Sequence, residues 1–144
     1  MNFRVIEYGS DDFKQECELR QHVLRVPLGL NLYDEDLAAE SSQRHFGLFD
    51  DNQRLLGCAI AVFISSGEAK IRQMAVSVAH QGMGLGRQIM LGIEANLAQS
   101  GYSHLTLHAR LNVAGFYEKL GYQRTGREFV EVGIPHIKME KRVG

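Results

Sequence analysis

The sequence has few of the features that mark several special classes of protein. It has no tryptophan, two prolines, two cysteines and a formal net charge of −1. The cysteines, Cys17 and Cys58, form no CxxC pair, so neither a zinc site nor a redox motif nor a disulfide framework is indicated. We therefore expect reduced, structural thiols in a cytoplasmic protein. The near-neutral charge also argues against nucleic acid or membrane as a partner.

Long apolar runs are also missing. None approaches the roughly 20 residues that span a bilayer, and the first residues, MNFRVIEYGSDDF, are too polar for a secretory signal. What is present is ordinary for a globular protein, with 144 residues, 44% hydrophobic and 23% charged. This length predicts one domain, residues 1–144, with a substantial core.

The hydrophobic pattern of the first half predicts strands joined by short turns. A helix is expected from the Ser10-Asp11-Asp12 start to about Val26. The run LLGCAIAVFI lacks polar alternation, which is typical of a strand covered on both faces. The strands expected here comprise residues 3–8, 45–49, 55–64 and 69–76, and short turns make the last three antiparallel neighbours.

The second half predicts a parallel crossover followed by a hairpin. Leu85, Ile89, Ile93 and Leu97 form the apolar face of a helix over 84–100, between strands at 69–76 and 103–108. A short helix is expected over 112–120 with Val113, Phe116 and Leu120 on one side, and with Phe116 as a core residue. A strand should start at 122–124, and 129–132 should pair with 136–139 around a 133–135 turn. The fold class is α+β: a three-layer arrangement with a mixed, mostly antiparallel, twisted sheet of six or seven strands and flanking helices.

The glycine-rich turn Gln81-Gly82-Met83-Gly84-Leu85-Gly86 lies between an apolar strand and that long helix. Glycines let the backbone approach an anion, and a helix N-terminus offers free N–H groups and partial positive charge. Arg87 adds a guanidinium. The spacing is neither the Rossmann fingerprint nor a P-loop. The alternative interpretation is a tight connection that allows close helix–sheet packing.

Three segments together resemble a known family. The pattern Gln81-x-x-Gly84-x-Gly86 looks like the acetyl-CoA pyrophosphate loop of the GNAT superfamily of N-acetyltransferases, and Asn112-x-x-Gly115-Phe116-Tyr117 resembles the segment after its fifth strand. The tail from Glu128 to Met139 is similar to the end of small bacterial ElaA-like acetyltransferases. The specific resemblance covers about residues 70–140.

The resemblance implies a GNAT fold whose parallel fourth and fifth strands splay apart, acetyl-CoA as cosubstrate, and no metal. The loop N–H groups would hold the pyrophosphate, and the edge of strand 69–76 would pair with the pantetheine arm. Asn112 has a second interpretation, as the N-cap of the helix that follows it. The implied cofactor-binding residues are Met74, Ala75, Val76, Gln81, Gly82, Met83, Gly84, Leu85, Gly86, Arg87, Asn112, Gly115, Phe116 and Tyr117.

The implied reaction is direct transfer of an acetyl group to a primary amine in a ternary complex. Tyr117 would protonate the leaving thiolate, or else is simply an aromatic core residue. A base must take the amine proton. His136 is the first choice because imidazole titrates near neutral pH, and it could equally be a hydrogen-bonded strand residue. The other candidates are Glu131, Glu128 and His108. A backbone N–H near Val76 would meet the oxyanion.

The acceptor is not identified by the sequence. Its pocket is expected to come from residues 20–36 and 124–136, where the acidic Asp34, Glu35, Asp36, Glu128 and Glu131 would suit a cationic amine or simply form a solvated surface. The acyl length stays open, and a homodimer is compatible with the resemblance. The alternatives are a non-catalytic acyl-CoA-binding or regulatory module and, more remotely, a nucleotide-phosphate-binding protein.

Overall fold

The structure, a computed structural model, describes residues 1–144 and contains seven strands in one sheet. Their hydrogen-bonded order is β1-β2-β3-β4-β5-β7-β6, with a parallel pair at β4/β5 and antiparallel pairs at β1/β2, β2/β3, β5/β7 and β6/β7. This confirms the predicted mixed, mostly antiparallel sheet. The strands are β1 (Asn2–Ile6), β2 (Arg44–Phe49), β3 (Leu55–Ser65), β4 (Glu68–Val76), β5 (His104–Arg110), β6 (Gln123–Glu131) and β7 (Ile134–Arg142).

The helices differ in regularity between the two halves of the chain. Ser10 begins the first one as predicted, since its Oγ accepts from the Phe13 N–H at 3.2 Å. Gly101 follows the long helix with φ 91°, as expected of a glycine after a helix end. The helices are α1 (Asp11–Arg20), the π-turn η1 (Gln21–Arg25), the 3-10 turns η2 (Val26–Leu28), η3 (Leu32–Asp34), η4 (Leu37–Ser42), η5 (Val78–His80) and η6 (Leu111–Val113), α2 (Leu85–Gln99) and α3 (Ala114–Lys119). None is long and apolar enough to cross a bilayer.

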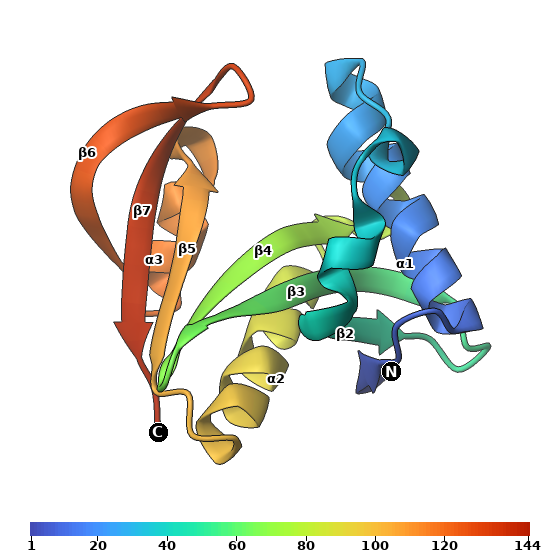
Figure 1. The fold of residues 1–144 in the computed structure, drawn as a ribbon, viewed down its shortest axis with the longest axis horizontal. Helices are drawn as coiled ribbons and strands as arrows, with labels where there is room; N and C mark the ends of the chain where they lie inside the picture. The colour runs from blue at the N-terminus through green and yellow to red at the C-terminus, as the bar shows by residue number, and fades with distance from the viewer. The chain divides into compact units, whose positions relative to one another are not determined.

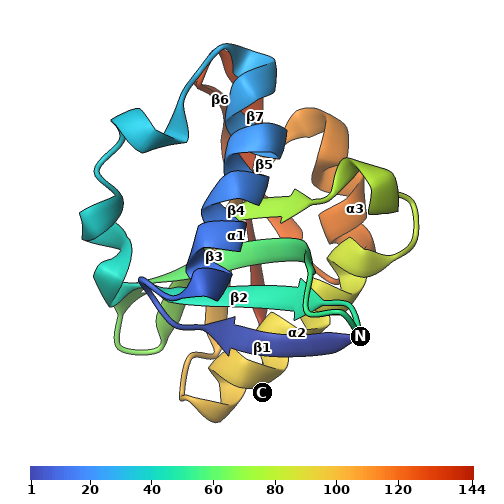
Figure 2. The ribbon, with the colours of Figure 1, turned by 90° about the vertical axis from the view of Figure 1, so that its right-hand side faces the viewer.

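The chain forms two compact units, one of residues 1–62 and 73–93 and one of residues 63–72 and 94–144. In the first unit, β3 has helices on both faces, and Figure 2 shows α1 crossing in front of β2 and β3. A Cβ on Gly57 would lie 2.5 Å from Ile89 of α2, whereas the next residue, Cys58, belongs to the cluster that includes Phe13 and Cys17 of α1. The two-sided burial predicted for this strand is therefore confirmed.

The second unit contains β5, β6 and β7, the start of β4 and the helix α3 (Figure 1). The parallel ladder runs from Glu68↔His104 to Ile71↔Leu107. One side of these strands is buried and apolar, through residues such as Leu105, Leu107, Ile137 and Met139. Residues at the alternate positions are polar, and they form the other side of the sheet.

The expectation that Phe116 is the core residue of the helix at 112–120 is wrong. Val113 and Phe116 are 41% and 37% exposed, whereas Ala114 and Tyr117 are buried. The reason is that a 3-10 turn occupies 111–113 and the α-helix begins only at Ala114, which changes the helical phase. Asn112 lies inside that 3-10 turn and caps neither helix.

Two strand predictions at the ends of the chain also need correction. The first strand ends at Ile6 instead of residue 8, where the turn that precedes α1 begins. The segments at 122–124 and 129–132 belong to one strand, β6, with a register shift between Thr125 and Phe129. The turn to β7 lies at Val132 and Gly133, whose φ values are 47° and 73°. Two consecutive positive φ values make a tight two-residue hairpin turn, so Ile134 and Pro135 are in the strand.

Candidate functional site

The glycine loop lies in the first unit, between η5 and α2. Gly82 and Gly84 have φ values of 81° and 77°, and a Cβ on either residue would meet nothing within 4 Å. The loop therefore needs glycine for backbone conformation and leaves open space above it. The alternative of a tight connection agrees with the positive φ values, but its close helix–sheet packing is absent at these two glycines, because no atom lies within 4 Å of either Cβ position.

The N-terminus of α2 carries unpaired donors. Its first helical hydrogen bond runs from the Gln88 N–H to the Gly84 carbonyl at 3.2 Å, so the N–H groups of 85–87 have no carbonyl within the helix to bond. Leu85 is buried and anchors this turn, while Met83 is 58% exposed. These free N–H groups, together with the helix dipole, form an anion-binding arrangement, and Arg87 is exposed beside them.

Gln81 ties this loop to the end of β4. Its Nε2 donates to the Val76 carbonyl at 3.2 Å. Of the three β4 residues expected to hold a cofactor, Ala75 is buried, and Met74 and Val76 are half-buried. The structure thus brings together, within one unit, the strand end and the loop that the sequence predicted as one half of a binding site.

A strained residue precedes that strand end. Gln73 has φ 59°, which is unusual for a residue with a side chain, and it follows the last residues of β4 that pair with β5. Its Oε1 accepts from Arg25 Nη2 at 3.0 Å, and Arg25 also binds Glu35 at 2.6 and 3.1 Å. The segment that follows α1 is therefore bound to Gln73 of β4, a link that sequence analysis missed because Gln73 lies 48 residues from Arg25 in the chain.

Tyr117 lies in the second unit, on α3. Its ring packs edge-on against Phe116 at 5.0 Å and Tyr122 at 5.9 Å between centroids. Burial raises the pKa of Tyr117 to about 12, and no protein group hydrogen-bonds its hydroxyl. Asn112 and Gly115, predicted to contact the cofactor, are exposed on the same segment.

The two other predicted catalytic residues meet at the β6–β7 hairpin. Glu131 Oε2 lies 3.7 Å from His136 Nε2, and Glu131 Oε1 lies 3.2 Å from His108 Nδ1. Phe129 packs against both imidazoles. Glu128 is exposed and has no partner in this cluster. The structure thus groups three of the four residues that the sequence suggested as bases.

The protonation pattern of this cluster follows from its partners. His136 Nδ1 lies 2.7 Å from the Ile134 carbonyl, which only accepts, so Nδ1 carries the proton and Nε2 is left to accept one. Partial burial raises the pKa of Glu131, but the hydrogen bond and charge of His108, with His136 and Lys70, outweigh burial and lower it overall. The carboxylate therefore stays ionised and lies beside both imidazoles, where it favours a positive charge on either ring.

Comparison with known proteins assigns the chain. A family model described as the acetyltransferase (GNAT) domain matches residues 29–143. The chain belongs to this family. A "putative acetyltransferase" of Bacillus subtilis strain 168 is 37% identical over 145 residues, covering 99% of this chain and 97% of that protein. The GNAT resemblance identified from the glycine loop and the Asn112–Tyr117 segment is confirmed.

Solved GNAT structures share the fold. Escherichia coli ElaA matches with a TM-score of 0.82 at 21% identity, over 99% of this chain and 100% of that chain. An aminoglycoside 6'-N-acetyltransferase complexed with coenzyme A matches with a TM-score of 0.79 at 16% identity, over 99% and 97%. As a GNAT chain, the protein is an acetyltransferase family member whose fold is used for acyl-CoA chemistry.

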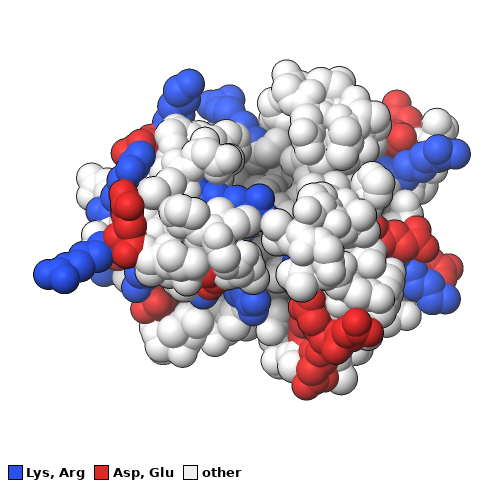
Figure 3. Space-filling model, turned by 90° about the horizontal axis from the view of Figure 1, so that it is seen from above, with Lys and Arg blue, Asp and Glu red and all other residues white.

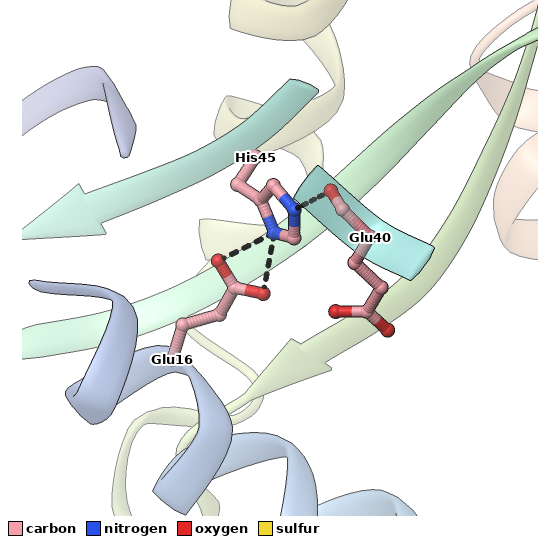
Figure 4. A group of neighbouring side chains, drawn as sticks. All are labelled: Glu16, Glu40 and His45. Atoms are coloured by element: carbon pink, nitrogen blue, oxygen red, sulfur yellow. Dashed lines mark hydrogen bonds and ion pairs between the residues drawn. The ribbon is translucent and has the colours of Figure 1, made fainter. Parts of the chain in front are cut away.

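A second polar cluster in the GNAT chain is buried at Glu16 and His45 and half-buried at Glu40 (Figure 4). His45 Nδ1 lies 2.8 and 3.0 Å from the Glu16 carboxylate oxygens, and its Nε2 lies 3.0 Å from the Glu40 carbonyl. Ligand atoms of Glu16, Glu40 and His45 lie within 4.8 Å of one another, as a metal site requires. Arg20, however, already binds Glu16 at 2.8 Å and Glu40 at 2.6 and 2.8 Å, so the carboxylates have their own cation.

The remaining surface features are less specific. A shallow groove of about 620 Å³ in the first unit is lined by Asp50, Asn52, Arg54, Leu55, Leu56, Ser77 and His80. On the face drawn in Figure 3, acidic and basic side chains are interspersed over a mostly uncharged surface.

Cys17 and Cys58 are both buried free thiols, and burial raises the pKa of Cys17 to about 11. Neither thiol has the lowered pKa of a nucleophile.

Proposed function

We propose that the protein is an acetyl-CoA-dependent N-acetyltransferase that passes the acetyl group directly to a primary amine within a ternary complex. The observation that carries the proposal is the loop at the start of α2, with two left-handed glycines under open space and three unpaired helical N–H groups. Membership of the GNAT family supports acyl-CoA as the ligand of this loop. The coenzyme A complex of a structural neighbour agrees with that assignment.

The loop and β4 would hold the two ends of the cosubstrate. The N–H groups of 82–87 bind the pyrophosphate, with Arg87 adding charge, and the backbone of Met74, Ala75 and Val76, beyond the last β4 residue that pairs with β5, pairs with the pantetheine arm. Gln81 fixes the distance between these two parts through its bond to the Val76 carbonyl. In the second unit, Asn112, Gly115 and Phe116 are exposed on the segment that leads into α3, and the family resemblance suggests them as cofactor-binding residues.

The chemistry needs a proton acceptor and a site for the leaving sulfur. The amine nitrogen attacks the thioester carbon, its proton passes to His136 Nε2, directly or through water, and the carbon–sulfur bond breaks to release the thiolate. Glu131, 3.7 Å from that nitrogen, stabilises the positive charge that the imidazole gains with the proton. Tyr117, with a pKa of about 12, remains protonated at neutral pH and donates a hydrogen bond to the departing sulfur. Full proton transfer to a thiolate, whose thiol has a pKa of about 8.5, would be unfavourable.

The decisive experiment changes the loop without removing any side chain that contacts the ligand. Gly84→Ala forces a Cβ onto a backbone with φ 77°, and we expect acetyl-CoA affinity to fall at least 10-fold in calorimetric titration. Gly9→Ala is the matched control, because Gly9 has φ 79° and equally open surroundings but lies outside the loop. Equal affinity in both variants, or no binding by the folded wild type, contradicts the proposal.

Thiol release with a panel of amines separates the enzyme from the alternative, a non-catalytic acyl-CoA-binding module. The enzyme releases free CoA in step with amine acetylation, whereas the module binds acetyl-CoA and releases none. Replacing acetyl-CoA with longer acyl-CoA donors tests the acyl length. We further propose that residues 1–144 act as a single catalytic domain and that the protein works in the cytoplasm, where its two free thiols stay reduced.

A further inference from the structure

One face of the sheet in the second unit carries an excess of unpaired cations. Lys70 pairs with Thr106 in the ladder, His108 pairs with Lys138, and Arg110 pairs with His136. Residues two apart on a strand share a face, so these positions, with Arg72, lie on the polar side of β4, β5 and β7. None of the four cations, Lys70, Arg72, Arg110 and Lys138, forms an ion pair.

The ammonium group of Lys70 is directed at a nitrogen instead of a carboxylate. Lys70 Nζ lies 3.3 Å from His108 Nδ1, and the same Nδ1 lies 3.2 Å from Glu131 Oε1. These two contacts are incompatible. A lysine N–H needs the lone pair of Nδ1, whereas the carboxylate needs a proton on it. In either neutral tautomer, one of the two hydrogen bonds is therefore missing.

The electrostatics of Lys70 agree with a missing anion. Partial burial lowers the pKa of Lys70, the positive charges of Arg72 and Lys138 lower it further, and Glu131 acts in the opposite direction. The cations outnumber the one carboxylate that acts on Lys70, and an added anion would be attracted to each of them. An anion that accepts from Lys70 would also free His108 Nδ1 to donate to Glu131.

We infer that this face binds an anionic group of the acceptor, so that the acceptor is an amine that also carries a carboxylate or phosphate. The inference rests on the proposed function and names the substrate class of the same site. Lys70 and Lys138 hold the anionic group, and Glu131 and His136 lie in the same cluster to receive the amine proton. The acidic residues that suggested a cationic acceptor have protein partners in two cases, Glu35 with Arg25 and Glu131 with His108.

Matched acceptors test the inference. L-phenylalanine and L-phenylalanine amide differ by one negative charge, as do phosphoethanolamine and ethanolamine by the phosphate. We expect kcat/KM to be at least 10-fold higher for the charged member of at least one pair, and the pair affected distinguishes carboxylate from phosphate. For phenylalanine the preference would oppose intrinsic reactivity, because the amide has the less basic amine and more of it is unprotonated.

The double substitution Lys70→Gln and Lys138→Gln should abolish that preference, bringing kcat/KM for the charged acceptor down to that of its neutral partner. Lys14→Gln removes one of the same charges from α1, where the side chain is 76% exposed, and should change neither rate. If neutral acceptors are used as well as charged ones, or if the double variant slows both members equally, the inference is wrong while the proposed function stands. Failure of acetyl-CoA to bind would instead overturn the proposed function.

A binding measurement decides the inference even if no amine in the panel is acetylated. N-acetyl-L-phenylalanine, titrated at constant ionic strength, should shift the backbone NMR signals of Lys70, His108 and Lys138. Its neutral amide should not shift them, and the double lysine variant should respond to neither compound. If neither N-acetyl-L-phenylalanine nor inorganic phosphate shifts these three signals, there is no anion site on this face.

Discussion

Single side chains decide the chemistry at the residue scale. Tyr117 is the clearest case, because it is buried, its hydroxyl has no protein partner, and its pKa is about 12. Tyr117→Phe removes only the hydroxyl. We expect kcat to fall about 10-fold, since the leaving sulfur loses one hydrogen bond worth about 1.4 kcal/mol. Acetyl-CoA affinity by calorimetry should stay within 2-fold, and an unchanged kcat removes Tyr117 from the reaction.

The second prediction for a single residue concerns His136 as the base that takes the amine proton. If its Nε2 accepts the amine proton, His136→Asn should flatten the ascending limb of the pH–rate profile, because the group that must be unprotonated is gone. Acetyl-CoA binding should be unaffected. His22→Asn is the control, since His22 is exposed on η1 and outside the cluster. An ascending limb of the same shape in the His136 variant would assign the base to another group.

At the scale of elements, one buried network joins α1, η4 and β2. Both nitrogens of His45 face acceptors, the Glu16 carboxylate and the Glu40 carbonyl, so both bonds form only when the ring is doubly protonated. Burial lowers the pKa of His45, but the hydrogen bond and charge of Glu16, with smaller effects from Glu40, raise it overall. The cluster is balanced, with Arg20 and His45 against Glu16 and Glu40.

This network predicts a pH dependence of stability. Because the folded pKa of His45 lies above its unfolded value of about 6.5, its contribution is complete below about pH 6.5 and is lost as pH rises through the folded pKa. Urea unfolding from pH 5.5 to 9 should show the free energy of unfolding falling with pH. His45→Gln should remove that slope and cost on the order of 3 kcal/mol at pH 6. A wild-type stability that rises over this range contradicts the assignment.

At the scale of the whole molecule, acetyl-CoA binding should stabilise the fold. A ligand at 100 times its dissociation constant adds about 2.7 kcal/mol, which corresponds to roughly 5–10 °C in Tm for a chain of this size. Thermal unfolding with and without acetyl-CoA measures this shift. Gly84→Ala should lose most of it at the same ligand concentration, and Gly9→Ala should retain it. A shift of equal size in all three proteins would place the ligand away from the glycine loop.

Local patterns were enough to determine much of the protein from sequence. The apolar run of β3, the four-residue repeat of α2 and the glycine loop each act through neighbours in the chain, so element type, the α+β class and the family could be predicted. The glycine loop can be recognised as an anion-binding segment without any residue distant in the chain. Its free N–H groups follow from the start of a helix, wherever that helix lies.

Tertiary structure decided the features that depend on residues far apart. Glu16 and His45 meet across 29 residues, and Lys70 and His108 across 38, so no local pattern reports the buried Glu16–His45 pair or the incompatible contacts at His108 Nδ1. The phase of α3 was also decided there, because a 3-10 turn at 111–113 buries Tyr117 and exposes Phe116. Periodicity records which residues share a face, whereas charge pairing and proton positions depend on which faces meet, and only the folded chain determines that.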